Sequence, residues 1–292
     1  MPSSGIPICI ASAISFGTMG IFGKLAYDGG SSVTTLLATR FGLAALLVWA
    51  LALGTSGLRR LRGVPRRDLA IALALGALAY GAQAGCYFVA LERLDASLLS
   101  LLVYTFPAIV AVAAILMGRE RASRRGTVAL LLASAGLALV LAGAGTGALD
   151  PLGTLLGLTA ACIYAAYVLS SEGVARRLGP LMLSALVCSG AAVTLTLAGL
   201  VTGSLNPSEV SADGYASLAG IAVVSTVAAL GLFFAGLELV GPTTASILST
   251  AEPVTAVVLA FLVFGESLAL AQLAGGALVL AGVLVLTTKE VS

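Results

Sequence analysis

The sequence predicts an all-α polytopic membrane protein in which ten transmembrane helices form two inverted five-helix repeats, with cytoplasmic N and C termini. Three observations predict this architecture: a composition poor in charge, ten apolar stretches of membrane-spanning length, and a self-similarity at half the chain length. Charged side chains make up 10% of the 292 residues and hydrophobic ones 59%, whereas about a quarter of the residues in soluble domains are charged. The apolar stretches recur along the whole chain, so we expect the bilayer to be its main solvent.

Ten stretches are long enough to cross a membrane, because about 20 mostly apolar helical residues span roughly 30 Å of hydrocarbon. The predicted spans cover residues 6–27, 32–54, 67–91, 96–118, 126–143, 152–172, 180–201, 214–237, 244–264 and 269–287. Charged or helix-breaking residues separate them, among them Asp28-Gly29-Gly30, Asp150-Pro151 and Gly241-Pro242. The first span is too long for a signal peptide and no basic segment precedes it, so we expect it to be retained.

Basic residues indicate the orientation, because Lys and Arg accumulate in cytoplasmic loops. Arginines cluster in alternate loops, at 59–67, 119–125 and 176–177, and Lys289 follows the last span. This distribution predicts that both termini lie in the cytoplasm. We expect a multi-pass protein of the bacterial cytoplasmic (inner) membrane.

The two halves of the chain resemble each other at an offset of 146 residues. This offset aligns Gly85, Phe88, Leu91, Glu92, Pro107 and Glu120 with Gly231, Phe234, Leu237, Glu238, Pro253 and Glu266. Each half, 1–146 and 147–292, holds five spans, and this odd number inverts the second repeat. Together the halves form one predicted transport domain, because many carriers alternate access to a midplane site through inverted repeats.

Two segments of the second half resemble a family signature. The letters AEPVTA at 251–256, followed by FGE at 264–266, are similar to the EamA-domain signature of the drug/metabolite transporter (DMT) superfamily. The first half agrees at 16–17, 40–41 and 107–120. It departs at Phe106, which replaces the Glu before Pro, and the second half has Tyr164-Ala165 where an aromatic-Gly pair is expected.

The resemblance implies a basket-shaped, ten-helix carrier that exports small organic metabolites. Members similar to the YddG type export neutral and aromatic amino acids, which makes these the expected substrates here. Alternatives within the same fold are a multidrug or organic-cation carrier and a carrier of sugar-phosphate-type metabolites. A membrane scaffold or subunit without transport activity is the alternative outside carriers, and a channel's ring of repeated charges is not evident.

Polar aromatic residues near the middle of two spans predict a substrate cavity. Tyr80, Gln83 and Tyr87 share one helical face of the third span, and Tyr164 and Tyr167 share a face of the sixth. Phenols and an amide suit a neutral or zwitterionic solute, because rings stack on apolar parts while polar tips orient the rest. The alternative is that these side chains hydrogen-bond between helices.

Two prolines fall at equivalent midpoints of the fourth and ninth spans. Pro107 and Pro253 each remove a backbone donor and free carbonyl groups, which predicts either a hinge or a static kink. Tyr104 lies one turn before Pro107 and Ser246 about two turns before Pro253. We expect both to face the same cavity.

Three charged residues lie within or near the spans. Glu252 is the only carboxylate well inside a span, so it is a candidate for proton coupling or a structural partner of nearby hydroxyl groups. Lys24 and Arg40 lie near the predicted outer helix ends. We expect them to fasten those ends by snorkelling or by pairing with Asp28, Glu92 or Asp95, and the alternative is an outer gate.

The composition also argues against most enzymes. The chain has no His and four scattered Cys, which removes His-based catalysis and the usual zinc ligand sets. We expect no enzyme activity, no cofactor and no metal. The expected partners are a small-molecule substrate and the lipid bilayer, without nucleic acid, and we expect a monomer.

Overall fold

A computed structural model describes residues 5–54, 64–117, 124–143, 150–233, 235–236, 239, 248–249 and 251–287. Within these residues the chain forms helices and no strand. Six helical segments are long and apolar enough to cross a membrane: Gly5–Asp28, Val33–Gly54, Arg66–Leu91, Pro151–Ser171, Pro180–Thr202 and Ala212–Phe233. The all-α membrane fold is therefore confirmed, whereas the ten-span count and the cytoplasmic termini stay predictions.

The helices of the first half follow the predicted spans closely. They are α1 (Gly5–Gly17), α2 (Met19–Asp28), α3 (Val33–Gly54), α5 (Arg66–Ala74), η1 (Leu75–Tyr80), α6 (Gly81–Leu91), α7 (Ala96–Val103), α8 (Phe106–Leu116) and α9 (Arg124–Gly143). The second half contains α11 (Pro151–Leu178), α12 (Pro180–Thr202), η2 (Pro207–Glu209), α13 (Ala212–Ala222), η3 (Val223–Ala228), α15 (Ala251–Phe264) and α16 (Leu270–Thr287).

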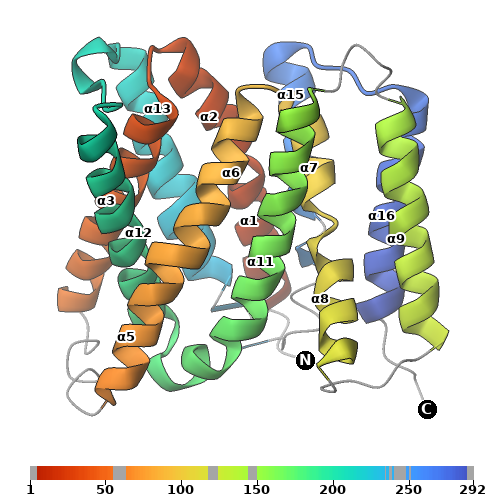
Figure 1. The fold of residues 1–292 in the computed structure, drawn as a ribbon, viewed down its shortest axis with the longest axis horizontal. Coiled ribbons are helices and arrows are strands. Elements are labelled where there is room, and N and C mark those ends of the chain that lie inside the picture. The colour runs from red at the N-terminus through yellow and green to blue at the C-terminus, as the bar shows by residue number, and fades with distance from the viewer. Residues whose placement is uncertain are drawn as a thin grey trace.

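The two halves pack on each other in a repeated pattern. The first helix of each half contacts the third helix of the other, as α2 does with α13 and α11 with α6. Repeat-equivalent helices also pair directly, α3 with α12 and α9 with α16. In Figure 1, α9 and α16 stand side by side at one edge of the bundle and run in opposite directions. This antiparallel pairing is the arrangement that an inverted duplication produces.

In the part of the chain that the structure describes, each half has one π-helical turn, and it lies in the third span. These turns are η1 and η3, and both continue directly into or out of α-helix. In η3 the Thr226 hydroxyl donates to the carbonyl oxygen of Ile221 at 2.9 Å, which satisfies a carbonyl next to the widened turn. Single π-turns inside α-helices occur often at functional sites.

Two glycines allow the third span of the first half to lie against α12. A Cβ atom on Gly76 would lie 2.0 Å from the carbonyl oxygen of Val187, and one on Gly190 would lie 2.2 Å from that of Leu73. Both neighbours are backbone atoms, which cannot move aside cheaply, so only glycine fits this contact. Small residues permit such close helix packing in membranes.

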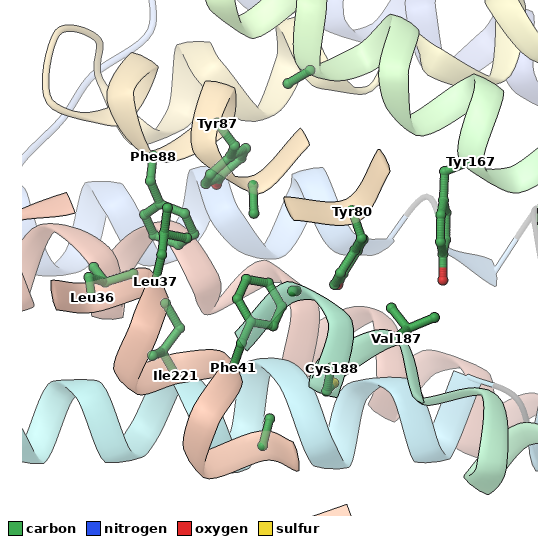
Figure 2. Close-up of a cluster of buried hydrophobic side chains, with 14 of the residues drawn as sticks. Leu36, Leu37, Phe41, Tyr80, Tyr87, Phe88, Tyr167, Val187, Cys188 and Ile221 are labelled. Carbon is green, nitrogen blue, oxygen red and sulfur yellow. The ribbon is translucent and has the colours of Figure 1, made fainter. Parts of the chain in front are cut away.

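The packed core positions the aromatic residues that follow. Phe41 of α3 is fully buried, and its ring centre lies 5.5 Å from that of Tyr80 in an edge-on contact. The Tyr80 ring lies 5.3 Å from that of Tyr167 on α11. Figure 2 shows Tyr80 between Phe41 and Tyr167, with Cys188 of α12 nearby. Helices of both halves therefore hold this ring in place.

Candidate substrate cavity

A cavity lies where the first, second, third and fourth spans of the first half meet α11 and α15. Its lining residues are Phe16, Gly17, Met19, Arg40, Tyr80, Gln83, Tyr87, Ser100, Val103, Tyr104, Phe106, Tyr164, Glu252 and Ala256. Both halves contribute to this wall, and apolar rings alternate with hydroxyl, amide and charged groups. Such a lining suits a small organic solute with polar ends.

The structure brings most of the predicted cavity residues together. Tyr80, Gln83, Tyr87, Tyr104 and Tyr164 all line the cavity. The predicted residue Tyr167 is buried behind this wall, with its ring stacked on that of Tyr164 at 6.1 Å. Ser246 lies outside the described residues.

Six aromatic rings form a continuous series from α3 to the end of α7. Neighbouring ring centres are 4.6 to 6.1 Å apart along Phe41, Tyr80, Tyr167, Tyr164, Phe106 and Tyr104. Ring pairs at these separations attract each other beyond simple burial. The series therefore holds four of the cavity-lining rings, Tyr80, Tyr164, Phe106 and Tyr104, in place.

The fourth span is broken rather than kinked. α7 ends at Val103 and α8 begins at Phe106, so the chain leaves the helix at Tyr104 and Thr105, just before Pro107. Pro107 and Pro253 lie in the first turns of α8 and α15, where a missing backbone donor costs little. The Tyr104 hydroxyl donates to the carbonyl oxygen of Ser249 and so joins this break to the residues before α15.

Arg40 lies in the cavity wall and is only 2% exposed. Its Nε donates to the Thr226 hydroxyl at 2.9 Å, and its guanidinium carbon lies 4.8 Å from the centre of the Phe41 ring and 5.4 Å from that of Phe88. Cation–π contacts of this kind stabilise a desolvated arginine.

The prediction that Arg40 fastens an outer helix end is wrong. Arg40 forms no ion pair with Asp28, Glu92 or Asp95, all of which the structure describes. The sequence gives only the depth of Arg40 along its helix, whereas helix rotation decides which neighbours it meets. The sequence did not predict Thr226 as the hydrogen-bond partner of Arg40. Thr226 lies in the π-helical turn η3, and such a turn leaves no signal in the sequence pattern.

Glu252 lies in the first turn of α15 and lines the same cavity. Glu252 and Arg40, both described by the structure, form no ion pair with each other. Both charges nevertheless act electrostatically on Tyr80 and Tyr87, which lie in the same wall. The predicted hydroxyl partner Thr255 donates to the carbonyl oxygen of Ala251 at 2.7 Å.

Lys24 lies at one end of the bundle in a group that we call the Glu266 cluster: Lys24, Asp95, Ala96, Ser97 and Glu266. The Lys24 Nζ is 2.8 Å from Glu266 Oε1 and 3.7 Å from Asp95 Oδ1. Asp95 was one of its predicted partners, whereas Glu266 was not, although it belongs to the FGE signature.

The Glu266 carboxylate receives four hydrogen bonds. Besides Lys24, the donors are the Ala96 N–H at 3.2 Å, the Ser97 N–H at 3.1 Å and the Ser97 hydroxyl at 2.9 Å. Burial alone raises the pKa of Glu266, but the hydrogen bonds from Lys24 and Ser97 outweigh it and hold the pKa below the usual glutamate value. The first turn of α7 also favours a negative charge.

An ion pair, which we call the Asp68 pair, lies at the opposite end of the bundle. Arg177 Nε and Nη2 donate to the two carboxylate oxygens of Asp68 at 2.7 and 3.0 Å. The pair joins the start of α5 to the end of α11, and these helix ends lie at the lower end of the view in Figure 1. α2 and α15 end at the upper end, where α7 begins. Both groups therefore connect the two halves, at opposite ends of the bundle.

Comparison with known proteins identifies the family. The EamA-like transporter family matches the chain twice, over residues 3–142 and 151–288. An "Uncharacterized transporter" of Archaeoglobus fulgidus is 29% identical over 280 residues, which cover 94% of this chain and 93% of that protein. The "Uncharacterized transporter YcbK" of Bacillus subtilis is 25% identical over 279 residues, covering 94% and 89%.

A solved structure titled "Crystal structure of protein" has the same fold. It covers 98% of this chain and 97% of its own, with a TM-score of 0.69 and 20% sequence identity. Among the residues that the structure describes, no group of three or more His, Cys, Asp or Glu side chains is placed to hold a metal ion.

Proposed function

The chain belongs to the EamA-like transporter family, and we propose from this premise that it is a secondary transporter that exports neutral or aromatic amino acids. The observation that carries the substrate proposal is the composition of the cavity wall. It combines phenol rings and an amide with one cation and one carboxylate that are not paired to each other. An amino acid has an apolar side chain for the rings and two polar ends for the charged groups.

The proposed mechanism is alternating access between two inverted repeats, residues 1–146 and 147–292. The repeated packing of the halves and the antiparallel pair of α9 and α16 support it. The join at 146 lies outside the described residues. Ionic contacts between the halves at both ends of the cavity are what a rocking carrier makes and breaks in turn.

The proposed orientation has ten spans in the bacterial inner membrane with both termini in the cytoplasm. α5 and α9 begin and α11 ends at one end of the bundle, where α16 also ends (Figure 1). Arginines stand at three of these helix ends: Arg66, Arg124 and Arg177. This bias supports a cytoplasmic position for that end and an outer position for the Glu266 cluster.

Counterflow in proteoliposomes tests the function. Purified protein is offered a panel of labelled neutral, aromatic and basic amino acids, a sugar phosphate and a cationic dye, with and without a pH gradient. We expect saturable exchange of neutral or aromatic amino acids. Exchange confined to the dye or the sugar phosphate would replace the substrate proposal, and exchange of none of these solutes would favour a scaffold or subunit.

A pair of tyrosine variants localises the activity to the cavity. Tyr164→Ala removes a ring of the cavity wall, whereas Tyr215→Ala removes a ring that is 44% exposed. We expect Tyr164→Ala to lower the exchange rate about tenfold, because it removes a ring that lines the cavity, and a ring contact with an aromatic solute contributes about 0.5–1.5 kcal/mol. Equal exchange rates in the two variants would show that the transport path does not pass Tyr164.

A further inference from the structure

Arg40 has the features of a receptor for a carboxylate. Its guanidinium group carries five N–H donors in a planar fork that matches a carboxylate. Thr226 accepts from Nε, and Tyr80 is a further polar neighbour in the cavity wall. The rings of Phe41 and Phe88 hold the cation in place. No carboxylate among the described ion pairs neutralises it, and a buried charge of this kind needs an anionic partner.

Glu252 has the features of a receptor for an ammonium group. It lines the same cavity wall as Tyr104 and Tyr164, so it lies among the phenols of the cavity. A carboxylate beside aromatic rings binds organic ammonium groups through charge and ring contacts together. Arg40 and Glu252 line the same cavity and form no ion pair with each other, so neither satisfies the other.

The charge balance of the cavity distinguishes between the candidate solutes. Of the residues that line it, Arg40 is the one base and Glu252 the one acid. A zwitterion matches both, whereas an organic cation leaves Arg40 unmatched and a sugar phosphate brings negative charge to Glu252. Unmatched buried charges are costly, so a site of this kind selects against both alternatives.

We propose that Arg40 binds the α-carboxylate of the transported amino acid and that Glu252 binds its α-ammonium group, while the aromatic wall takes the side chain. This assignment rests on the proposed function. It makes Arg40 and Glu252 the residues that determine specificity for zwitterions. It also implies that the protein recognises both the α-carboxylate and the α-ammonium group of the substrate.

The first test uses the unaltered protein. Exchange of labelled phenylalanine in proteoliposomes is competed with unlabelled phenylalanine, with phenylalanine amide, which lacks the carboxylate, and with N-acetylphenylalanine, which lacks the ammonium group. We expect each derivative to compete at least about tenfold more weakly than phenylalanine, because a site built to bind a polar group rejects the analogue that lacks it. Equal competition by either derivative would overturn the assignment of the corresponding residue.

The second test uses two charge-removing variants. In Arg40→Gln, we expect the preference for phenylalanine over its amide to fall to about threefold or less, while discrimination against the N-acetyl derivative is kept. In Glu252→Gln, we expect discrimination against N-acetylphenylalanine to fall to about threefold or less, while the preference for phenylalanine over its amide is kept. Matched controls are Arg124→Gln and Glu92→Gln, which change exposed residues outside the cavity lining and keep both preferences.

The outcomes separate this assignment from the proposed function. If the unaltered protein exchanges amino acids but both variants keep both preferences, the assignment is wrong and the function stands. If the unaltered protein exchanges no amino acid, the function itself fails. Should Arg40→Gln not fold, the competition test on the unaltered protein still decides the assignment, and Arg40→Lys, which keeps the charge without the fork, provides a second variant.

Discussion

The two ionic groups that connect the halves differ in how they are built. In the Glu266 cluster the carboxylate side chain is 8% exposed and receives hydrogen bonds from α2 and α7. In the Asp68 pair the carboxylate side chain is about as buried, at 9% exposed, but among the described residues its one partner is Arg177, whose side chain is 54% exposed. An ion pair whose cation is hydrated contributes less to stability than a buried carboxylate with several donors, because removing that carboxylate leaves all of its donors unpaired. The end that carries the Glu266 cluster is therefore the more firmly closed one.

Under the proposed alternating access, this difference gives each end a different role. A carrier needs contacts that hold one end closed while the other opens. Lys24 and Ser97 belong to the first half and Glu266 to the second, so opening this end requires all their bonds to break together. The Asp68 pair breaks at less cost, which makes its end the easier one to open.

Replacement of Glu266 by Ala is expected to have the largest effect. It leaves Lys24 and two backbone N–H groups of α7 without their acceptor. We expect the free energy of unfolding, measured by denaturant titration in mixed micelles, to fall by about 3 kcal/mol. Glu266→Gln keeps one acceptor oxygen and serves as the control with a smaller loss. A loss no larger than that of Asp68→Asn would contradict the comparison.

Acid is expected to weaken the same cluster by a smaller amount. Because the pKa of Glu266 is lower in the folded protein than in the unfolded chain, its stabilisation is fully present above the unfolded value of about 4.3 and is lost as the pH falls through the lower folded value. Between pH 5 and 8 the contribution of Glu266 should be constant. Unfolding measured from pH 6 to pH 3 should show a fall that is reduced in Glu266→Gln, and identical pH profiles would show that Glu266 does not titrate in this way.

Asp68→Asn is expected to cost about 0.5–1 kcal/mol in the same titration, because Arg177 is exposed enough to be hydrated after the pair is broken. We also expect Asp68→Asn to change the exchange rate measurably despite this small loss of stability, since it weakens the contact at the end that is proposed to open. A loss of stability equal to that of Glu266→Ala would mean that the two ends are equivalent.

Arg177→Lys is expected to have the smallest effect. Lysine keeps the charge but cannot form the two parallel hydrogen bonds to Asp68. We expect a loss of about 0.5 kcal/mol or less in the free energy of unfolding, within the range of exposed ion pairs. A loss above that of Asp68→Asn would indicate that Arg177 has a further partner.

The sequence predicts much of this fold because membrane-spanning helices depend on local composition. The apolar stretches correspond to the observed helices, and the face shared by Tyr80, Gln83 and Tyr87 does line a cavity. What the sequence could not predict depends on contacts between distant segments. Glu266 meets Lys24 from 242 residues away, and Arg40 meets Thr226 from 186 residues away.

Backbone irregularities are the other part that sequence reasoning missed. The π-turns η1 and η3 contain ordinary helix-forming residues, so no periodicity distinguishes them. Pro107 did mark an irregularity in the fourth span, but the chain breaks at Tyr104 and Thr105, ahead of the proline. The reason is that proline fits the first turn of the helix that follows.

Alternating access is tested most directly by the accessibility of a single cysteine in the cavity. Ser100 lines the cavity and is close to cysteine in size, so Ser100→Cys is placed in a variant whose four native cysteines are replaced by Ala. A membrane-impermeant thiol reagent is then applied to each side of oriented vesicles. We expect labelling chiefly from the side of the Asp68 pair, and a shift toward the other side when Glu266→Gln is added. Equal labelling from both sides, unchanged by Glu266→Gln, would contradict alternating access and indicate a continuous pore.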